Sequence, residues 1–131
     1  MNVRRFDPDG DLIIVKAHLF GKHGGRPLSL ALDTAASHTH ISSDIVDDLG
    51  YSPIDGEAIT SVRSAIGNEP GYTLRVKRFQ SLGFGFDDFL IHVHDLPGGF
   101  GIDGLLGLSF LKRFNYEIRS AEGRILVERV A

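Results

Sequence analysis

The feature that most constrains this chain is a short apolar strand ending in a carboxylate, within residues 28–42 (LSLALDTAASHTHIS). Leu28, Leu30 and Leu32 fall on one face of an extended segment, because side chains alternate sides along a strand. Asp33 follows directly, so a rigid element delivers a carboxylate to the edge of the predicted core. The small residues and hydroxyls that come next let another group approach the backbone and can orient the carboxylate through hydrogen bonds. The stretch is therefore a candidate active-site segment, although an Asp in this context also fits an ordinary turn or helix cap.

A second segment, residues 101–114 (GIDGLLGLSFLKRF), favours the active-site interpretation. Its apolar part, Ile102–Leu108, lies between glycines and is typical of a strand buried on both faces. An Asp-Thr-x-Ala-Ser sequence followed much later by an apolar-apolar-Gly segment resembles the retropepsin-like aspartic proteases, whose motif is Asp-Thr/Ser-Gly-Ala-Ser/Thr. The resemblance extends from about Leu12 to Val130.

This resemblance implies an all-β fold: a closed, acid-protease-like β-barrel with a flap hairpin and one or two short helices, forming a single domain over residues 1–131. It implies that Asp33 is the catalytic residue. It assigns active-site support to Thr34, Ala35, Ala36 and Ser37, with Thr34 tying two active-site loops together across an interface. It assigns flap and substrate-binding roles to Ile66, Gly67, Asn68 and Glu69. It assigns structural support beneath the site to Ile102, Asp103, Gly104, Leu105, Leu106 and Gly107.

One catalytic motif per chain implies a homodimer. Peptide hydrolysis by carboxylates needs an ionised and a protonated group together, and two carboxyls ~3 Å apart share a proton because they cannot both ionise. The motif occurs once in the sequence, so we expect the Asp33 side chains of two chains to meet on a two-fold axis. The expected function is an aspartic endopeptidase that hydrolyses an extended peptide or protein substrate through an activated water, without cofactor or metal. By analogy with the family, Arg124–Val130 is the expected interface strand.

Composition excludes other classes of function. Fourteen basic and seventeen acidic residues give a net charge of −3 without a basic block, which argues against a nucleic-acid partner. No apolar run approaches ~20 residues, so no membrane segment is expected. The chain has no cysteine, which suits a reducing compartment. We therefore expect a cytoplasmic protein.

Alternation and turn residues predict the remaining elements. Strands are expected over residues 11–20, 28–32, 86–96 and 102–108, with a closing hairpin from residues 116–118 and 124–130. Helices are expected over residues 43–50, ending at a glycine, and 110–114, capped by Ser109. A hairpin arm is expected from residues 58–65 and 72–76, with its tip at residues 66–71.

Two alternatives to the protease remain open. Ala35 stands where the family most often has Gly, and its Cβ could crowd the catalytic water or bar a positive φ angle. The chain could then be a catalytically silent dimerisation or peptide-binding module. In addition, Asp103 is either a second carboxylate near the site or a turn residue before Gly104.

The other alternative is a metal-binding β protein. Two pairs of histidines, His38 with His40 and His92 with His94, each stand two residues apart, which places each pair on one strand face. With a carboxylate such as Asp44 or Asp95 they could bind Zn²⁺ or Cu²⁺. Alternatively, His38 could act on the Asp33 carboxylate.

Overall fold

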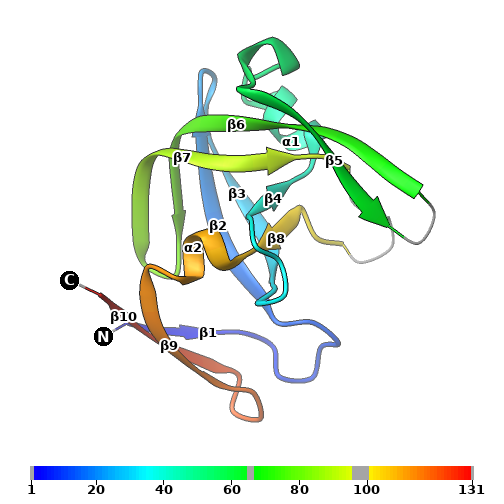
Figure 1. Ribbon diagram of the computed structural model, residues 1–131. Coiled ribbons are helices and arrows are strands. Elements are labelled where there is room, and N and C mark those ends of the chain that lie inside the picture. The colour runs from blue at the N-terminus through cyan, green and yellow to red at the C-terminus, as the bar shows by residue number, and fades with distance from the viewer. Residues whose placement is uncertain (1, 65–66, 96–100, 131) are drawn as a thin grey trace.

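The computed structural model describes residues 2–64, 67–95 and 101–130 (Figure 1). Its strands are β1 (Asn2–Arg5), β2 (Ile14–Gly21), β3 (Gly24–Leu32), β4 (His40–Ile41), β5 (Ala58–Ser64), β6 (Gly67–Ser81), β7 (Phe84–Val93), β8 (Gly104–Leu106), β9 (Phe114–Arg119) and β10 (Arg124–Arg129). Its helices are α1 (Ser43–Asp48), α2 (Leu108–Leu111) and a single 3₁₀ turn, η1 (Pro53–Asp55). No helix in these described ranges has the length and apolar character needed to cross a membrane.

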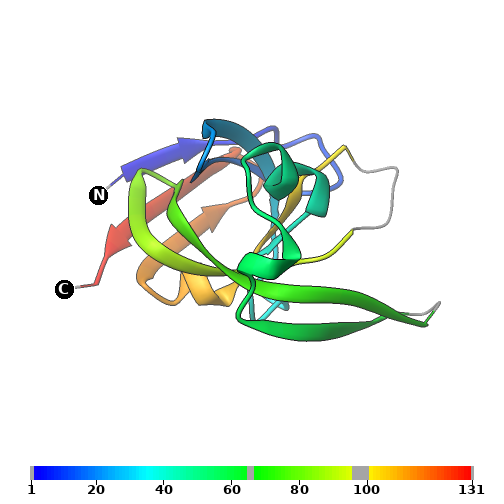
Figure 2. The same cartoon turned by 90° about the horizontal axis from the view of Figure 1, so that it is seen from above.

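Six of the strands close into a barrel in the order β2-β3-β8-β4-β7-β6. The ring closes because β6 pairs back onto β2, from Ala17 opposite Ser81 to Phe20 opposite Arg78. β5 continues the sheet beyond β6, and the two form an arm that extends past the barrel (Figure 2). The predicted all-β barrel with two short helices is confirmed.

The two ends of the chain form a second, three-stranded sheet in the order β1-β10-β9. On one side of β10, Asn2 of β1 pairs with Val127; on the other side, Phe114 of β9 pairs with Arg129. β10 is therefore the central strand, flanked within its own chain. The assignment of Arg124–Val130 as the interface strand stays a prediction, and within one chain the outer strands of this sheet are β1 and β9.

The core is built from the strand faces that alternation predicts. Val15, Ala17 and Leu19 of β2 are buried, and so are Leu28 and Leu30 of β3. Phe89, Ile91 and Val93 of β7 are buried as well. Aromatic rings complete the packing around Phe79, whose ring centroid lies 5.1 Å from that of Phe89 and 5.5 Å from that of Phe110.

Three elements differ from their sequence-based boundaries. The predicted arm tip is too long, because Gly67–Gly71 belong to strand β6, where they pair with Ser64–Thr60 of β5. The buried strand predicted over residues 102–108 is shorter and spans Gly104–Leu106. The helix predicted over residues 110–114 begins earlier, at Leu108. Apolar character does not distinguish the end of a buried strand from the start of a buried helix.

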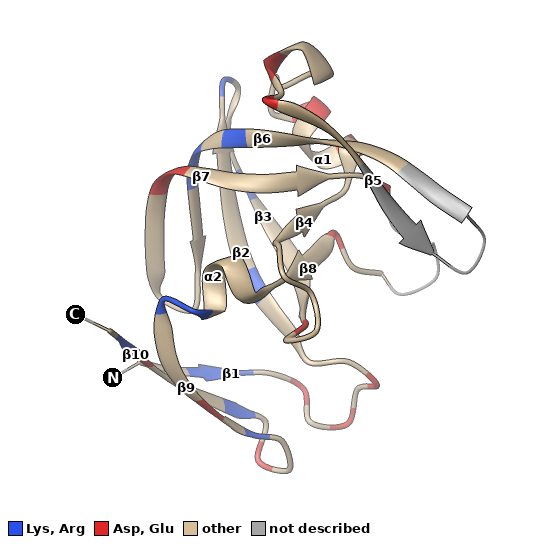
Figure 3. Ribbon diagram, viewed as in Figure 1, with Lys and Arg blue, Asp and Glu red and all other residues tan. Residues whose placement is uncertain are grey.

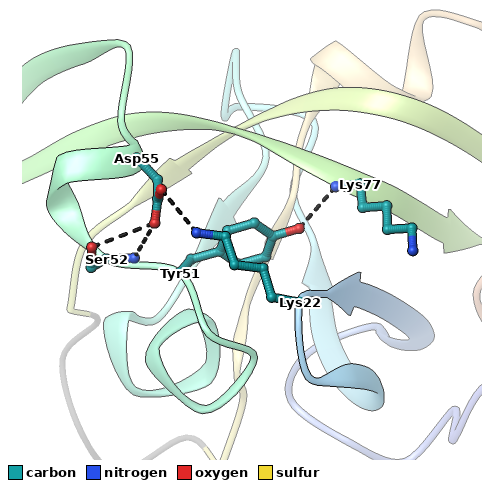
Figure 4. A network of polar contacts seen from close by, with 5 residues as sticks. All are labelled: Lys22, Tyr51, Ser52, Asp55 and Lys77. Atoms are coloured by element: carbon teal, nitrogen blue, oxygen red, sulfur yellow. Dashed lines mark hydrogen bonds and ion pairs between the residues drawn. The ribbon is translucent and has the colours of Figure 1, made fainter.

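A polar network joins the segment after α1 to the barrel (Figure 4). The Tyr51 hydroxyl donates to the Phe20 carbonyl and accepts from the Lys77 amide, both at 2.9 Å. Asp55 accepts from the Ser52 amide at 2.9 Å and forms a 3.0 Å ion pair with Lys22. α1 and η1 are therefore fastened to β2 and β6 by hydrogen bonds as well as by apolar packing.

Basic and acidic residues both lie on the terminal sheet and its turn (Figure 3). Glu122 pairs with Arg119 at 3.2 Å and with Arg124 at 2.9 Å, which closes the turn between β9 and β10. Such exposed pairs each contribute at most ~1 kcal/mol. The core and the backbone ladders hold this sheet more than its charges do.

Substitution of Gly104 tests how closely β4 and β8 approach each other in the barrel. A Cβ there would lie 2.0 Å from the His40 carbonyl oxygen, so Gly104→Ala must push β4 and β8 apart. We expect a loss of about 2–4 kcal/mol in the free energy of unfolding, at or above the usual range for overpacking. Gly10→Ala is the control, because a Cβ at Gly10 would meet its nearest atom at 3.4 Å. Denaturant titration at fixed protein concentration measures both; equal losses would contradict the close approach.

Candidate active site

Asp33 lies at the first residue after β3, where the chain turns sharply (Figure 1, the loop between β3 and β4). Its amide donates to the Leu106 carbonyl of β8 at 2.9 Å, which ties the turn to the barrel. Its carboxylate Oδ1 accepts a hydrogen bond from the Ala35 amide at 2.9 Å. Asp33 is half-buried, and the neighbouring Thr34 is exposed. The carboxylate is therefore fixed in orientation while the surface of the turn stays accessible.

The segment after β8 lies directly beneath this turn. The Leu108 amide donates to the Ala36 carbonyl at 2.8 Å, and the Ser109 amide donates to the Ser37 carbonyl at 3.0 Å. Gly107 permits this approach, because a Cβ there would lie 2.1 Å from the His38 carbonyl oxygen. The glycine of the apolar-apolar-Gly segment thus has a steric explanation, and the main chain of the turn is held from below at several points.

Asp103 does not belong to this turn. Its carboxylate accepts from the Ser29 amide at 2.9 Å, and its own amide donates to the Ser29 carbonyl at 2.8 Å. Ser29 stands four residues before Asp33, which is about 13 Å along a strand. Asp103 therefore links β3 to the start of β8, as the turn-residue alternative requires. Ile102 and Leu105 are half-buried on either side of it, while Gly104 and Leu106 are buried.

Ala35 fits the turn without backbone strain. Among the described residues, the non-glycine residues with positive φ are Leu82 and Asp88, so Ala35 does not occupy the left-handed region. Its side chain is exposed, and its amide makes the bond to Asp33. The concern that a Cβ would bar the required φ angle is therefore removed.

Thr39 is a site residue that sequence reasoning missed. It is completely buried. Its Oγ1 accepts from the Gly107 amide at 3.3 Å and from the Ser109 hydroxyl at 3.1 Å, while its amide donates to Ser109 Oγ at 3.0 Å. Ser109 therefore bonds to the loop and does not cap α2, whose N-cap is Gly107. A threonine between two histidines carries no sequence signal for burial, so only the fold reveals this link.

The proposed flap residues lie partly outside the described structure. Ile66 falls outside the described residues. Gly67, Asn68 and Glu69 lie at the start of β6, where their backbones pair with Ser64, Arg63 and Val62 of β5. They form part of a paired arm, and their assignment to substrate binding stays a prediction.

Four histidines gather on one face of the β4–β7 pair, and we call His38, His40, His92 and His94 the histidine cluster. His40 lies opposite His92 in the parallel pairing. The His38 and His92 rings stack with centroids 4.0 Å apart, and His40 Nδ1 lies 3.1 Å from His94 Nδ1. Within the described residues, no three or more potential ligands are placed to hold a metal ion. Asp95, one of the carboxylates considered as a metal ligand, accepts a hydrogen bond from Ser43.

The surroundings of His40 and His92 favour the neutral form of these two rings. Burial, followed by the neighbouring rings of His94, His92 and His38, lowers the pKa of His40 to about 4, and Asp33 acts weakly in the opposite direction. Burial also lowers the pKa of His92, with contributions from His38 and His94. The influence of Asp33 on His40 shows that the cluster and the carboxylate lie within electrostatic range of each other.

Comparison with known proteins identifies the family. The family model for aspartyl proteases matches residues 20–110, which includes the Asp33 turn, β8 and most of α2. The chain belongs to the aspartyl protease family. No curated protein sequence matches the chain at a significant level.

Solved structures show which fold this member of the aspartyl protease family shares. A retropepsin-like aspartic protease from Rickettsia conorii matches with 22% identity and a TM-score of 0.69, covering 95% of this chain and 96% of that one. The retroviral protease-like domain of Ddi1 from Leishmania major matches with 13% identity and a TM-score of 0.63, covering 94% and 97%. EIAV protease, complexed with the inhibitor HBY-793, matches with 20% identity and a TM-score of 0.51, covering 76% and 82%. The fold is thus retropepsin-like over almost its whole length.

The Thr39 link can be tested by a matched pair of substitutions. Thr39→Val keeps the shape of the side chain but leaves the Gly107 amide and the Ser109 hydroxyl without their acceptor, so we expect a loss of about 1–3 kcal/mol in the free energy of unfolding. Thr60→Val is the control, because Thr60 Oγ1 is buried with no hydrogen-bond partner among the described residues. It should be neutral or stabilising. Thermal and denaturant unfolding measure both, and a neutral Thr39→Val would refute the link.

Proposed function

We propose that this aspartyl protease is an endopeptidase whose active site forms when two copies of the chain bring their Asp33 carboxylates together. The observation that carries the proposal is the Asp33 turn. The Ala35 amide orients the carboxylate of the half-buried Asp33, and the Asp33 backbone amide is bonded to the Leu106 carbonyl. Thr34 and Ala35 are exposed at the same turn. A carboxylate held in this way is accessible to a partner chain and a substrate, because it is not fully buried within its own chain.

The proposed chemistry needs both carboxylates. An ionised Asp33 takes a proton from a water molecule as its oxygen attacks the scissile carbonyl carbon. The protonated Asp33 of the partner subunit donates a hydrogen bond to the carbonyl oxygen, and a proton then passes to the leaving amine as the C–N bond breaks. Two such groups ~3 Å apart share a single proton, so the pair titrates as one unit and favours mildly acidic pH.

The arm formed by β5 and β6 is the proposed flap. Its strands are paired from Ala58–Thr73 out to Ser64–Gly67, and its outer part extends past the barrel (Figure 2). In this proposal the arm covers an extended peptide and keeps water from the reacting bond. The peptide lies as an added strand, held by main-chain hydrogen bonds, and side-chain pockets supply selectivity.

Replacement of Asp33 tests the chemistry. Asp33→Asn keeps the size of the side chain but removes the ionisable group, so we expect cleavage of a diverse peptide library to fall by at least ~10³-fold. Asp9→Asn is the matched control, because Asp9 is exposed in the loop between β1 and β2, and its activity should equal that of the wild type. Cleavage of the same sites by Asp33→Asn at the wild-type rate would contradict the proposal. An absence of cleavage by either form would contradict it as well, and both outcomes would favour a silent module.

Mixing tests whether the site is shared between chains. If the site needs two Asp33 residues, mixing wild type with an equal amount of Asp33→Asn at concentrations well above dimer dissociation leaves a quarter of the dimers intact and lowers activity to about half that of the same wild-type sample alone. On dilution, specific activity should fall as dimers separate. Mixing with Asp9→Asn controls for crowding and should cause no loss. A monomeric enzyme would show unchanged activity in both experiments.

A further inference from the structure

The downstream anchor of the Asp33 loop is a very short strand. β4 contains two residues, His40 and Ile41, yet it is the strand that joins β7 to β8 in the barrel order. Its backbone contacts with β7 include the His92 amide bonded to the Thr39 carbonyl at 2.9 Å and the His94 amide bonded to the Ile41 carbonyl at 3.3 Å. A strand this short gains little from its ladder alone, so contacts between its side chains and those of β7 weigh heavily.

The side-chain contact across this junction depends on protonation. His40 Nδ1 and His94 Nδ1 are 3.1 Å apart, the distance of an N–H···N hydrogen bond. Such a contact holds one proton: one ring must donate from Nδ1 while the other accepts with a lone pair. One added proton can occupy the free Nε2 of the donating ring and leaves this hydrogen bond intact. When both rings are protonated, two Nδ1–H groups face each other and two positive charges lie side by side. The contact is therefore attractive while one Nδ1 keeps its lone pair and repulsive when both rings are cationic.

We propose that His40, hydrogen-bonded to His94 while the two rings share one Nδ1 proton, is a positioning residue for Asp33, and that protonation of both rings at acidic pH releases the loop and ends activity. This inference rests on the proposed protease function. It adds to that function an acid limit set by imidazoles outside the catalytic pair.

The groups that face His40 determine the pH range. β7 contributes His92, and His94 follows directly after that strand. The loop between β3 and β4 contributes Asp33 and His38. β8 contributes Leu105, which does not titrate. Burial and the three imidazoles outweigh the carboxylate, so the pKa of His40 falls from 6.5 to about 4. The unfolded chain then binds more protons than the folded chain between those values, and the stabilisation is lost as the pH falls from about 6.5 to 4.

The two titrating units place opposite demands on the enzyme. The proposed carboxyl pair requires one proton and gains it as the pH falls, whereas the His40 and His94 rings must not both become cationic. Activity should therefore be confined to a band of mildly acidic pH. Deprotonation of the carboxyl pair sets the alkaline limit of activity, and protonation of the histidine pair contributes to the acid limit.

His40→Asn tests the acid side. Asparagine places an amide close to the position of Nδ1, so it can hydrogen-bond to His94, and it does not titrate. We expect the acid midpoint of the kcat/KM profile to move down by about half a unit to one unit, with a smaller loss of thermal stability between pH 6.5 and 4. His23→Asn is the control, because His23 is exposed in the turn between β2 and β3; its profile should match the wild type.

His40→Leu separates the hydrogen bond from the charge. Leucine removes both, so we expect kcat/KM to fall at every pH, with the loss recovered in part by His40→Asn. NMR provides a readout that does not need activity. In the wild type, the chemical shift of the Ala35 amide, which is bonded to the Asp33 carboxylate, should change with pH as the His40 ring titrates. In His40→Asn this pH-dependent change should be absent.

The outcomes distinguish this inference from the proposed function. If the wild type is inactive but its Ala35 amide shift and melting temperature still change with the titration of His40, the proposed protease function is rejected and the coupling between His40 and the loop is kept. An active wild type whose acid limb and melting profile are the same in His40→Asn would overturn the positioning role and leave the protease intact. A His40 ring that titrates near 6.5 would also overturn it.

Discussion

The close approach of two backbones beneath the Asp33 turn is the constraint on which the rest of this structure depends. Gly104 and Gly107 bring β8 and the start of α2 so near to the loop that a Cβ at either position would overlap the carbonyl oxygen of His40 or His38. This proximity allows Leu106 to accept from the Asp33 amide. The carboxylate is consequently positioned by main-chain hydrogen bonds, which require no particular side chain in the loop above them.

That arrangement explains why the loop tolerates an unusual set of side chains. Ala35 replaces the glycine of the family motif without entering the left-handed region, since the bond to the Asp33 carboxylate comes from its amide. Buried polar groups below the loop, Thr39 and Ser109, satisfy one another and the Gly107 amide. A fully satisfied polar network of this kind adds rigidity to a core without leaving a costly unpaired group. The histidine cluster lies next to this hydrogen-bonded region, so positive charge on its rings would act on the loop that holds Asp33.

The parts of the fold that could be predicted from the sequence are those with long, regular patterns. β2 and β7 bury the faces that their alternation indicates, and α1 is followed by Gly50 at φ +90, as expected for a helix closed by glycine. The motif around Asp33 led to the correct family. β4 could not be predicted, because two residues carry no period, and β1 is a short, largely exposed strand whose pairing partner lies at the other end of the chain. The contact between His40 and His94 depends on that unpredicted strand, and the cytoplasmic location stays a prediction.

The terminal sheet has a consequence for how the molecule is made. β1 is synthesised well before its partner β10, and the Phe6 amide likewise donates to the Gly123 carbonyl. Contacts between residues so far apart in sequence form slowly, because a long loop must be closed before they contribute. The barrel can assemble from hairpins while synthesis continues, whereas β1 must wait for β10 to emerge before it can pair. A nascent chain of this protein thus carries an unsatisfied β-edge at β1 until the turn between β9 and β10 has left the ribosome.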